Sequence, residues 1–217
     1  MLDARPELTA LRRDRRRLVE RLAAAGVEEL EILHAFDAVP RHLFVPAALR
    51  QRAYEDVALP LGFDQTISRP SVHARFLQLA ELQGTEKVLE VGTGSGFQTA
   101  LVATLARQVY SVERIPELAR RARDRLRRLG LHASVRVGDG SMGWPEEAPF
   151  DVILVAAAAE DPPEALSRQL SEGGRLLIPV GDEDRQTIVR IRRTGKGWER
   201  EAVDRARFVP LRREESP

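Results

Sequence analysis

The chain has 217 residues, 43% hydrophobic and 31% charged, which is enough for one domain with a sizeable core and excludes a chain disordered throughout. Its 34 Lys and Arg residues against 33 Asp and Glu residues leave a formal net charge of +1, which excludes a whole-protein field that would hold nucleic acid or an anionic membrane. Because the chain has no cysteine, disulfides, thiolate metal sites and cysteine nucleophiles are excluded as well.

The amino-terminal segment is predicted to be helical. Apolar residues recur at helical spacing through residues 6–38, with an interruption at Gly26. Acidic residues lie among its arginines, which favours a solvated helix face over a nucleic-acid-binding one. No window approaches 18 apolar residues, and residues 1–21 lack the apolar region of a signal peptide. We therefore expect a cytoplasmic protein that binds neither membranes nor nucleic acid.

Residues 39–71 follow neither a helical nor a strand period. Prolines stand at positions 40, 46, 60 and 70, and Gly62 lies between them. A long irregular segment inside a compact protein is more often a functional cover or binding loop than a linker. We expect residues 1–70 to form a helical segment and a cover loop, and residues 71–217 to carry the site, the two parts making one structural unit.

From residue 71 onward, helical and strand patterns alternate. Helices are predicted at about 71–82 and at Phe97–Ala106, Pro116–Leu129 and Pro162–Leu170, and strands at Lys87–Val91, Gln108–Val112, Ser134–Val137, Val152–Val155 and Arg175–Val180. This alternation predicts a doubly wound α/β fold with a mostly parallel sheet and helices on both faces. Strands at Thr187–Arg192 and Trp198–Val203 and an extended piece at Arg207–Leu211 would add antiparallel edges.

A glycine-rich loop joins the first strand of this alternation to the next helix. Gly92, Gly94 and Gly96 would let backbone N–H groups approach a ligand at the carboxyl edge of the sheet, where α/β proteins bind ligands. A dinucleotide fingerprint is G-x-G-x-x-G, whereas this loop is G-x-G-x-G with Glu90 two residues before it. A carboxylate there would repel a pyrophosphate and suits a cationic ligand.

Two further carboxylates follow the next two strands. Glu113 could accept both hydroxyls of a ribose, a role that would serve NAD equally well, and Asp139 could accept from the amine of an adenine. Together with Glu90 and the glycine spacing, they favour S-adenosylmethionine, whose sulfonium and ammonium are positive. The alternatives are a helix-start acid for Glu113 and a turn residue for Asp139.

The sequence contains neither a histidine pattern typical of a metal site nor the serine motif of a hydrolase. The four histidines are scattered without a pair at metal-ligand spacing, so we expect no metal site and ordinary surface or packing roles for them. Gly94-Ser95-Gly96 does not supply the G-x-S-x-G frame of a hydrolase.

Several segments, in order along the chain, resemble the protein-L-isoaspartate O-methyltransferase family. They are Val39–Pro46, Ala53–Asp56, Leu59–Gly62, Gln65–Pro70, Glu90–Gln98, Ser111–Arg114, Gly138–Trp144, Gly173–Leu176 and Arg207–Leu211. The resemblance covers about residues 35–212, and the tetrapeptide Gln65-Thr66-Ile67-Ser68 is its most specific part. It implies a class I, Rossmann-like methyltransferase with a seven-stranded sheet and an N-terminal helical extension.

The resemblance also implies the reaction. A methyl group would pass from S-adenosyl-L-methionine to the free α-carboxylate of an L-isoaspartyl residue in a damaged protein or peptide, leaving S-adenosyl-L-homocysteine. The ester would close to a succinimide, which hydrolyses partly to normal aspartate. The protein would thus be a repair enzyme, and we expect a monomer.

By the same resemblance, Ser68 is the active-site serine. A carboxylate is already a nucleophile at neutral pH, so Ser68 should orient it rather than attack. The implied substrate-binding residues are Ser68, Val209, Pro210 and Leu211, and the implied cofactor-binding residues are Thr66, Ile67, Glu90, Gly92, Thr93, Gly94, Ser95, Gly96, Gln98, Glu113, Arg114, Asp139 and Gly140. The alternatives are a helix N-cap for Ser68 and a plain edge strand for the tail. The chain departs from residues common in the family at Ala58, Asp64, Phe97, Ala156 and Arg212.

Two other function classes stay open at this point. One is a related methyltransferase that acts on a small molecule or RNA with the same cofactor. The other is an NAD-binding oxidoreductase or a catalytically silent binding module, for which NAD rather than S-adenosylmethionine would raise the melting temperature.

Overall fold

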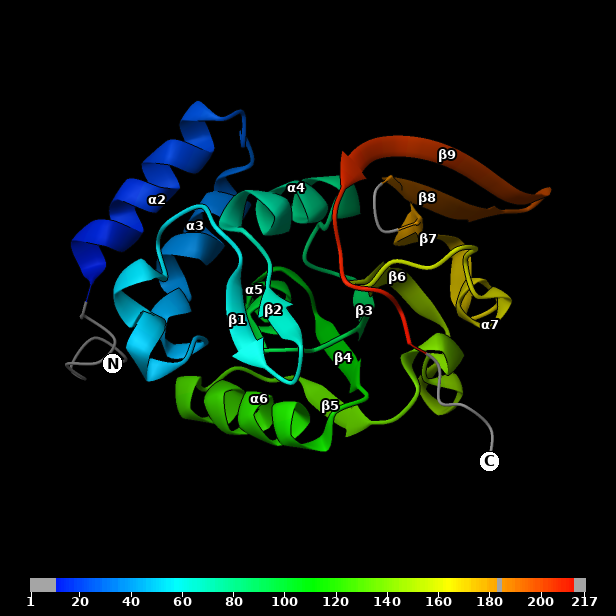
Figure 1. Ribbon diagram of the computed structural model, residues 1–217. Helices are drawn as coiled ribbons and strands as arrows, with labels where there is room; N and C mark the ends of the chain where they lie inside the picture. Colours follow the sequence, from blue (N-terminus) through cyan, green and yellow to red (C-terminus); the bar gives the residue numbers. More distant parts are fainter. Residues whose placement is uncertain (1–10, 183–184, 213–217) are drawn as a thin grey trace.

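A seven-stranded sheet runs through the computed structural model, which describes residues 11–182 and 185–212. Its strand order is β5-β4-β3-β6-β7-β8-β9 (Figure 1). The strands are β3 (Lys87–Val91), β4 (Gln108–Glu113), β5 (Ser134–Val137), β6 (Phe150–Val155), β7 (Leu170–Gly181), β8 (Gln186–Thr194) and β9 (Gly197–Ala206). Strands β3, β4, β5, β6 and β7 pair with one another in parallel, and β8 and β9 extend the sheet as an antiparallel hairpin. The predicted doubly wound α/β sheet is therefore confirmed.

Successive side chains of a strand point to opposite faces of the sheet, and the two faces build two apolar clusters. Val88 belongs to a large cluster that includes residues from α2 to α6, whereas Leu89 and Val91 belong to a smaller one with Leu166 of α7. The helices after the cover are α4 (Pro70–Ala80), α5 (Phe97–Leu105), α6 (Pro116–Leu129) and α7 (Glu164–Ser167). Each fully buried aliphatic or aromatic side chain contributes about 1.5–3 kcal/mol, so the larger cluster holds the cover and the sheet together.

Two predictions in the carboxyl-terminal half were wrong. The helix predicted at Pro162–Leu170 is only the four residues of α7, because Leu170 already begins β7 and pairs with Phe150 of β6. The segment Arg207–Leu211 does not join the sheet as an edge strand. Its Pro210 forms an isolated parallel bridge to Ala158, in the loop after β6.

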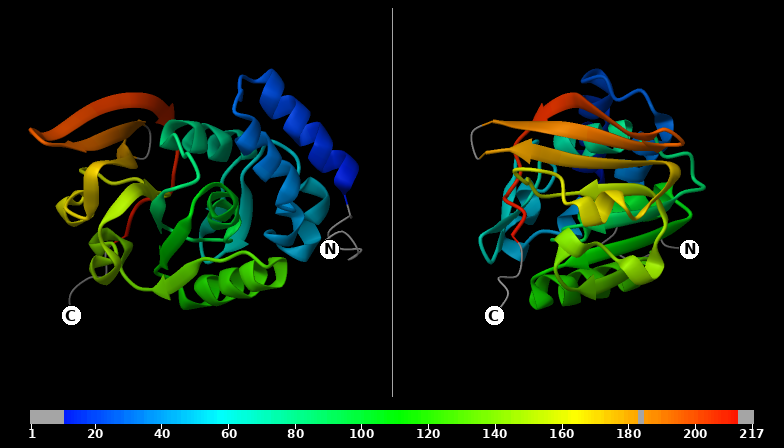
Figure 2. Two further views of the ribbon diagram at one scale, coloured as in Figure 1. Left: turned by 180° about the vertical axis from the view of Figure 1, so that it is seen from behind. Right: turned by 90° about the vertical axis from the view of Figure 1, so that its right-hand side faces the viewer.

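The amino-terminal helices pack on the helices beside the sheet, with α3 against α4 and α5 and α2 against α3. They are α2 (Arg12–Ala24) and α3 (Leu30–Ala38), separated at Gly26 as expected, and residues 6–10 of the predicted helix lie outside the described residues. Arg21 Nη2 of α2 donates to the carbonyl oxygen of Tyr54 at 2.6 Å. Figure 2 shows these helices at the opposite end of the molecule from the β8–β9 hairpin.

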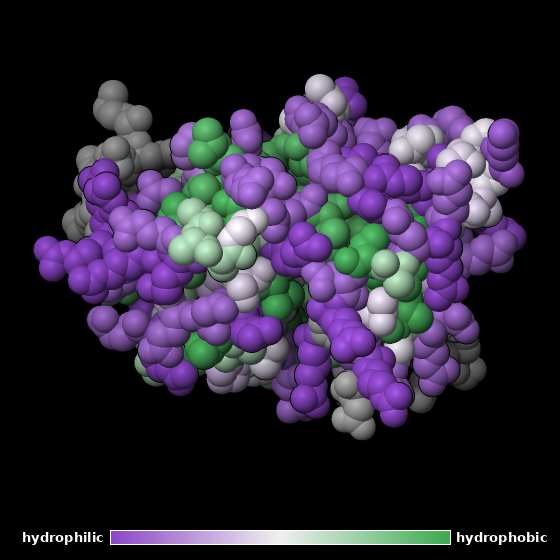
Figure 3. Space-filling view, turned by 90° about the horizontal axis from the view of Figure 1, so that it is seen from above, coloured by the Kyte–Doolittle hydropathy of each residue, from purple (hydrophilic) through white to green (hydrophobic). Residues whose placement is uncertain are grey.

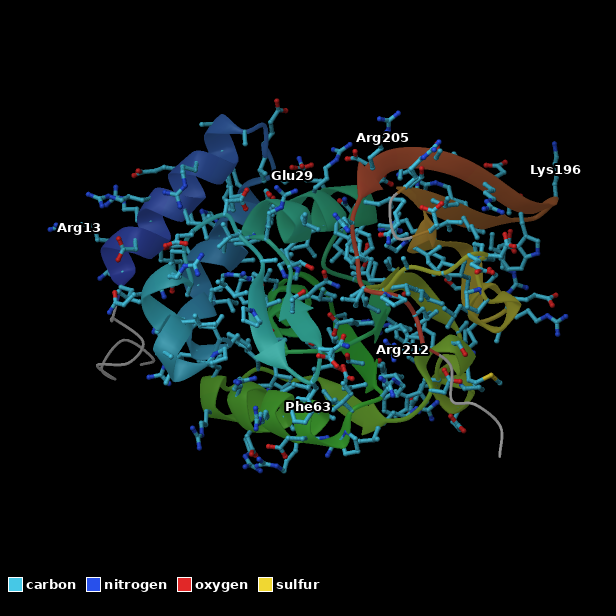
Figure 4. The ribbon with its side chains drawn as sticks, viewed as in Figure 1. Arg13, Glu29, Phe63, Lys196, Arg205 and Arg212 are labelled. Carbon is cyan, nitrogen blue, oxygen red and sulfur yellow. The ribbon has the colours of Figure 1, made fainter. Side chains whose placement is uncertain are left out.

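The cover segment contains regular structure that its sequence did not indicate. After the short 3-10 helices η1 (Arg41–Leu43) and η2 (Ala47–Arg52), strands β1 (Leu59–Gly62) and β2 (Gln65–Ile67) form an antiparallel hairpin. Its tip lies over α6, where the ring of Phe63 is 5.7 Å from the Arg121 guanidinium (Figure 4). The hairpin therefore reaches from the rest of the cover segment to helix α6.

The surface of the molecule is mainly hydrophilic. Seen from above in Figure 3, hydrophobic residues show in patches between charged and polar ones. No helix within residues 11–182 and 185–212 has the length and apolar character needed to cross a membrane.

Candidate active site

A cavity opens at the carboxyl ends of β3 and β4. The end of the β1–β2 hairpin forms one wall, the glycine loop after β3 and the turn after β4 form its floor, and the tail at residues 209–212 closes the opposite side. Counting its opening to solvent, the space is about 850 Å³. Arg212 lies at the end of the tail beside it (Figure 4).

Most of the predicted site residues lie in the wall of this cavity. They are Thr66, Ile67, Ser68, Gly92, Thr93, Gly94, Ser95, Gln98, Glu113, Arg114, Gly140, Val209, Pro210 and Leu211. The wall also contains residues that were not predicted: Gln65, His73, Val91, Val112, Ile115, Ala156, Ala157 and Arg212. Glu90, Gly96 and Asp139 do not line the cavity.

The glycine loop needs its glycines for two different purposes. Gly92 has a φ of 95°, a left-handed conformation that L side chains rarely adopt, and it lines the cavity. A Cβ atom on Gly96 would lie 3.0 Å from the Cβ of Ala122, so this glycine lets α5 begin close against α6. Gly96 does not line the cavity, and its predicted cofactor contact stays a prediction.

Glu113 holds the loop in place and still faces the cavity. Its side chain is buried, and its two carboxylate oxygens accept from the backbone N–H groups of Gly94, at 2.7 Å, and Ile115, at 2.9 Å. A carboxylate oxygen can accept a second hydrogen bond, so both oxygens can also accept from a ligand. The geometry suits a pair of neighbouring hydroxyls.

Glu90 does not line the cavity, and its predicted contact with a cationic ligand stays a prediction. Its side chain is completely buried, and Oε2 accepts from the hydroxyls of Thr99, at 2.5 Å, and Ser111, at 2.7 Å. Ser111 in turn lies 2.5 Å from the hydroxyl of Thr93, which lines the cavity. Burial raises the pKa of Glu90 to about 7. The carboxyl group therefore acts on the cavity through Ser111 and Thr93 and through Gln98, a lining residue whose polar side chain lowers the pKa of Glu90.

Asp139 is half-buried and does not line the cavity. Its Oδ1 accepts from the backbone N–H of Ser141 at 2.8 Å and caps the short helix η3 (Gly140–Met142). The side chain thus has the turn role that the sequence left open, and its contact with an adenine amine stays a prediction. Its neighbour Gly140 does line the cavity, and a Cβ atom there would lie 2.4 Å from Cγ1 of Val91. Only glycine allows the chain to pass so close to β3.

His73 and Gln98 bring unpartnered polar atoms to the cavity. Nδ1 of His73 lies 3.1 Å from Oε1 of Gln98, and both side chains are more than nine-tenths buried. Within the described residues, Nε2 of each is buried without a hydrogen-bond partner, which costs about 1–3 kcal/mol per group unless a ligand supplies one. Burial, with a smaller contribution from Arg41, lowers the pKa of His73 to about 3, so its ring is neutral at pH 7. These atoms fit a polar cofactor.

The Ser68 hydroxyl makes no hydrogen bond with another described residue, and Ser68 lines the cavity. The N-cap of α4 is Arg69, and Asp56 Oδ1 accepts from the backbone N–H of Ser71 at 2.9 Å, so the N-cap alternative for Ser68 is wrong. The Ser68 carbonyl oxygen accepts from Nη2 of Arg41 at 2.9 Å. Arg41 is itself fully buried, and this burial lowers its pKa to about 9. The backbone at Ser68 is therefore fixed while its hydroxyl lines the cavity.

The tail is fixed against the loop after β6. Ala158 donates its backbone N–H to the carbonyl oxygen of Val209 at 2.8 Å and accepts from the N–H of Leu211 at 2.6 Å. This places Val209, Pro210 and Leu211 in the cavity wall rather than at the edge of the sheet. Among the described residues, no three His, Asp or Glu side chains are arranged to hold a metal ion.

Comparisons with known proteins agree on one family. The family model described as protein-L-isoaspartate(D-aspartate) O-methyltransferase matches residues 13–216. A relative from Dictyoglomus thermophilum named protein-L-isoaspartate O-methyltransferase is 48% identical over 201 residues, which cover 92% of this chain and 91% of the relative. One from Trichlorobacter lovleyi with the same name is 50% identical over 200 residues, 91% of this chain and 92% of its own.

Solved structures give the same result for the fold. One named protein-L-isoaspartate O-methyltransferase superposes with a TM-score of 0.81 at 30% identity, covering 90% of this chain and 65% of that longer chain. A Plasmodium falciparum structure in complex with S-adenosyl-L-homocysteine superposes with a TM-score of 0.79 at 24% identity, covering 90% and 96% of the two chains, and shows the shared fold.

Proposed function

The chain belongs to the protein-L-isoaspartate(D-aspartate) O-methyltransferase family, and we propose that it methylates the free α-carboxylate of L-isoaspartyl residues in damaged proteins and peptides. The observation that carries this proposal is the meeting of Ser68, the glycine loop and Glu113 around one cavity. Closure of the ester to a succinimide then starts the repair to aspartate. S-adenosyl-L-homocysteine is the second product.

The residues of the cavity suit S-adenosyl-L-methionine as the cofactor. When bound, this cofactor supplies the methyl group on a positively charged sulfur. Glu113 would accept from its ribose hydroxyls, the backbone of the glycine loop and Gly140 would allow its close approach, and the lining residues Gln98 and His73 would face its polar groups. The family assignment favours this cofactor over NAD.

Ser68 has the role of orienting the substrate. An α-carboxylate is ionised at neutral pH, so the reaction needs no general base, and the Ser68 hydroxyl donates a hydrogen bond that holds the attacking oxygen. Well-oriented reactants can gain about 7–11 kcal/mol of the barrier from positioning alone. Arg41 supports this role because it fixes the Ser68 backbone, and the tail at Val209–Leu211 confines the peptide on the other side.

The setting of the reaction is also part of the proposal. Residues 1–70 serve as the cover of the site and residues 71–217 as the methyltransferase unit, and the protein acts as a monomer in the cytoplasm on proteins rather than on nucleic acid or membranes. The net charge of +1 supports the last point.

The proposal is tested with labelled S-adenosyl-L-methionine and paired peptides that differ only in an aspartyl or isoaspartyl linkage. We expect label on the isoaspartyl peptide alone, released by mild base as an ester should be. Equal labelling of both peptides, or of neither, would contradict the proposal. Base-stable label on RNA or a small molecule would indicate the related methyltransferase, and a melting temperature raised by NAD but not by S-adenosyl-L-homocysteine would indicate an oxidoreductase or binding module.

A further inference from the structure

A second cavity adjoins the first on the other side of Ser68. The two share Thr66, Ser68, Ala156 and Val209, and the second is completed by Ala58, Arg69, Val72, Arg207 and Phe208. Its volume is about 400 Å³, which is room for at least one amino-acid side chain. A peptide whose isoaspartyl carboxylate meets Ser68 therefore has this cavity beside the reacting residue.

The two sides of the second cavity are held together by contacts between α4 and the tail. The Phe208 ring packs on Phe76 of α4 with centroids 5.5 Å apart. The side chain of Gln186 donates to the Phe208 carbonyl oxygen at 3.0 Å and accepts from its backbone N–H at 2.6 Å. Arg75 of α4 forms an ion pair with Asp204 near the end of β9, at 2.5 Å. The chain on both sides of the cavity is thus fixed.

These two sides each carry one arginine. Arg69 precedes α4 and Arg207 precedes Phe208 in the tail, and both are exposed. Within the described residues, neither side chain makes an ion pair or a hydrogen bond, and no Asp or Glu lines the cavity. Arg75, the next arginine along α4, by contrast forms its ion pair with Asp204, outside the cavity.

We propose that the second cavity is a subsite for an acidic side chain next to the isoaspartyl residue, bound by Arg69 and Arg207. This inference rests on the proposed function. A guanidinium binds a carboxylate through paired N–H donors, and two guanidinium groups in a cavity that no Asp or Glu lines give it a positive potential that suits an acidic side chain. The chain accordingly selects damaged sites that have Asp or Glu as a neighbour.

The test uses short isoaspartyl peptides with Glu, Gln or Lys immediately before or after the damaged residue. In the unaltered protein we expect KM to be about tenfold lower for Glu than for Gln at one of the two positions, with similar kcat. Arg69→Ala and Arg207→Ala should each reduce this Glu-to-Gln preference about threefold, and the double variant should lose it. Because Arg69 makes no side-chain cap bond to α4, its replacement changes the charge without removing a cap.

A charge-reversal variant and a matched control complete the experiment. Arg69→Glu combined with Arg207→Glu should prefer the Lys peptide, a result that loss of folding cannot produce. Arg200→Ala removes another exposed arginine, on β9 outside the cavity, and should keep the original preference. An unaltered protein without any preference, or a double variant that keeps it through Arg114 and Arg212 in the first cavity, would overturn the inference.

Binding measurements separate this inference from the proposed function. Fluorescence anisotropy of the same peptides, with S-adenosyl-L-homocysteine present, reports the flanking preference even if none of them is methylated. No turnover on any isoaspartyl peptide would contradict the proposed function, whereas turnover that ignores the flanking residue would contradict the subsite alone.

Discussion

The buried carboxyl group of Glu90 gives a prediction about stability that can be worked out from the structure. Burial raises its pKa from 4.5 to about 7, against the opposing effect of the Thr99 and Ser111 hydroxyls. Between these two pH values the folded protein holds the proton and the unfolded chain releases it. The resulting stabilisation is therefore fully present below pH 4.5, is lost as the pH rises towards 7, and stays lost above it. The difference corresponds to about 3 kcal/mol, at 1.36 kcal/mol for each pH unit.

Glu90→Gln removes this pH dependence, because an amide is neutral throughout. Urea unfolding followed by circular dichroism at pH 5, 6, 7 and 8 should show the unaltered protein losing up to about 3 kcal/mol of stability relative to the variant across this range. Glu199→Gln, which changes an exposed carboxylate on β9, is the control and should follow the unaltered protein. Stability curves for Glu90→Gln and the unaltered protein that run parallel from pH 5 to pH 8 would refute the reasoning.

The same variant separates two roles for Glu90. Since the carboxyl group lies behind Thr93, its replacement should change the affinity for S-adenosyl-L-methionine only a few-fold, as measured by isothermal titration calorimetry. A loss of a hundredfold or more, without a change in the pH dependence of stability, would show that Glu90 contacts the cofactor directly, as the sequence suggested.

Three other substitutions test the site at separate points. Ser68→Ala should lower kcat at least about tenfold and leave the affinity for S-adenosyl-L-methionine within twofold, because only the substrate loses a hydrogen bond; equal losses in both would contradict the assigned role. Glu113→Gln should weaken cofactor binding about tenfold in calorimetry, because an amide nitrogen cannot accept from the Gly94 N–H and the charge-assisted bonds are lost. Gly140→Ala should reduce the free energy of unfolding by about 1–3 kcal/mol, because its Cβ atom would lie 2.4 Å from Val91. Adding Val91→Ala should lessen the effect of Gly140→Ala, and a double variant with purely additive losses would argue against the clash.

The parallel part of the fold was predictable because its periodic patterns are strong. Strand β3 and helix α6 have the predicted bounds, since Gly92 directly follows β3, Pro116 begins α6 and Gly130 follows α6. The helix predicted at Pro162–Leu170 failed because the apolar residues Leu166 and Leu170 also fit a strand. Pairing of Leu170 with Phe150 extends β7 at the expense of the helix, and no local signal reveals that pairing.

The β1–β2 hairpin was not predictable for a different reason. Its strands have four and three residues and include Pro60, so no period of two can establish itself. Its turn places Phe63 and Asp64 at φ of 56° and 55°, positions that Asn and Gly usually occupy in a tight hairpin. Without that turn signal the segment reads as an irregular loop, although it carries Ser68 to the cavity.

The position of Glu90 follows from the alternation of side chains between the two faces of β3, which the proximity of Glu90 to the glycine loop in the sequence obscured. In a strand of period two, Glu90 shares a face with Val88, which α5 covers, whereas Val91 faces the other way. The parallel register pairs Glu90 with Ser111 of β4, and the Thr99 hydroxyl of α5 donates to Glu90 from the same face of the sheet. A charged residue in the middle of a buried strand thus needs polar partners on the next strand and helix before it needs a ligand. The acid two residues before the glycine loop is therefore better interpreted as a support for the loop than as a contact for a sulfonium.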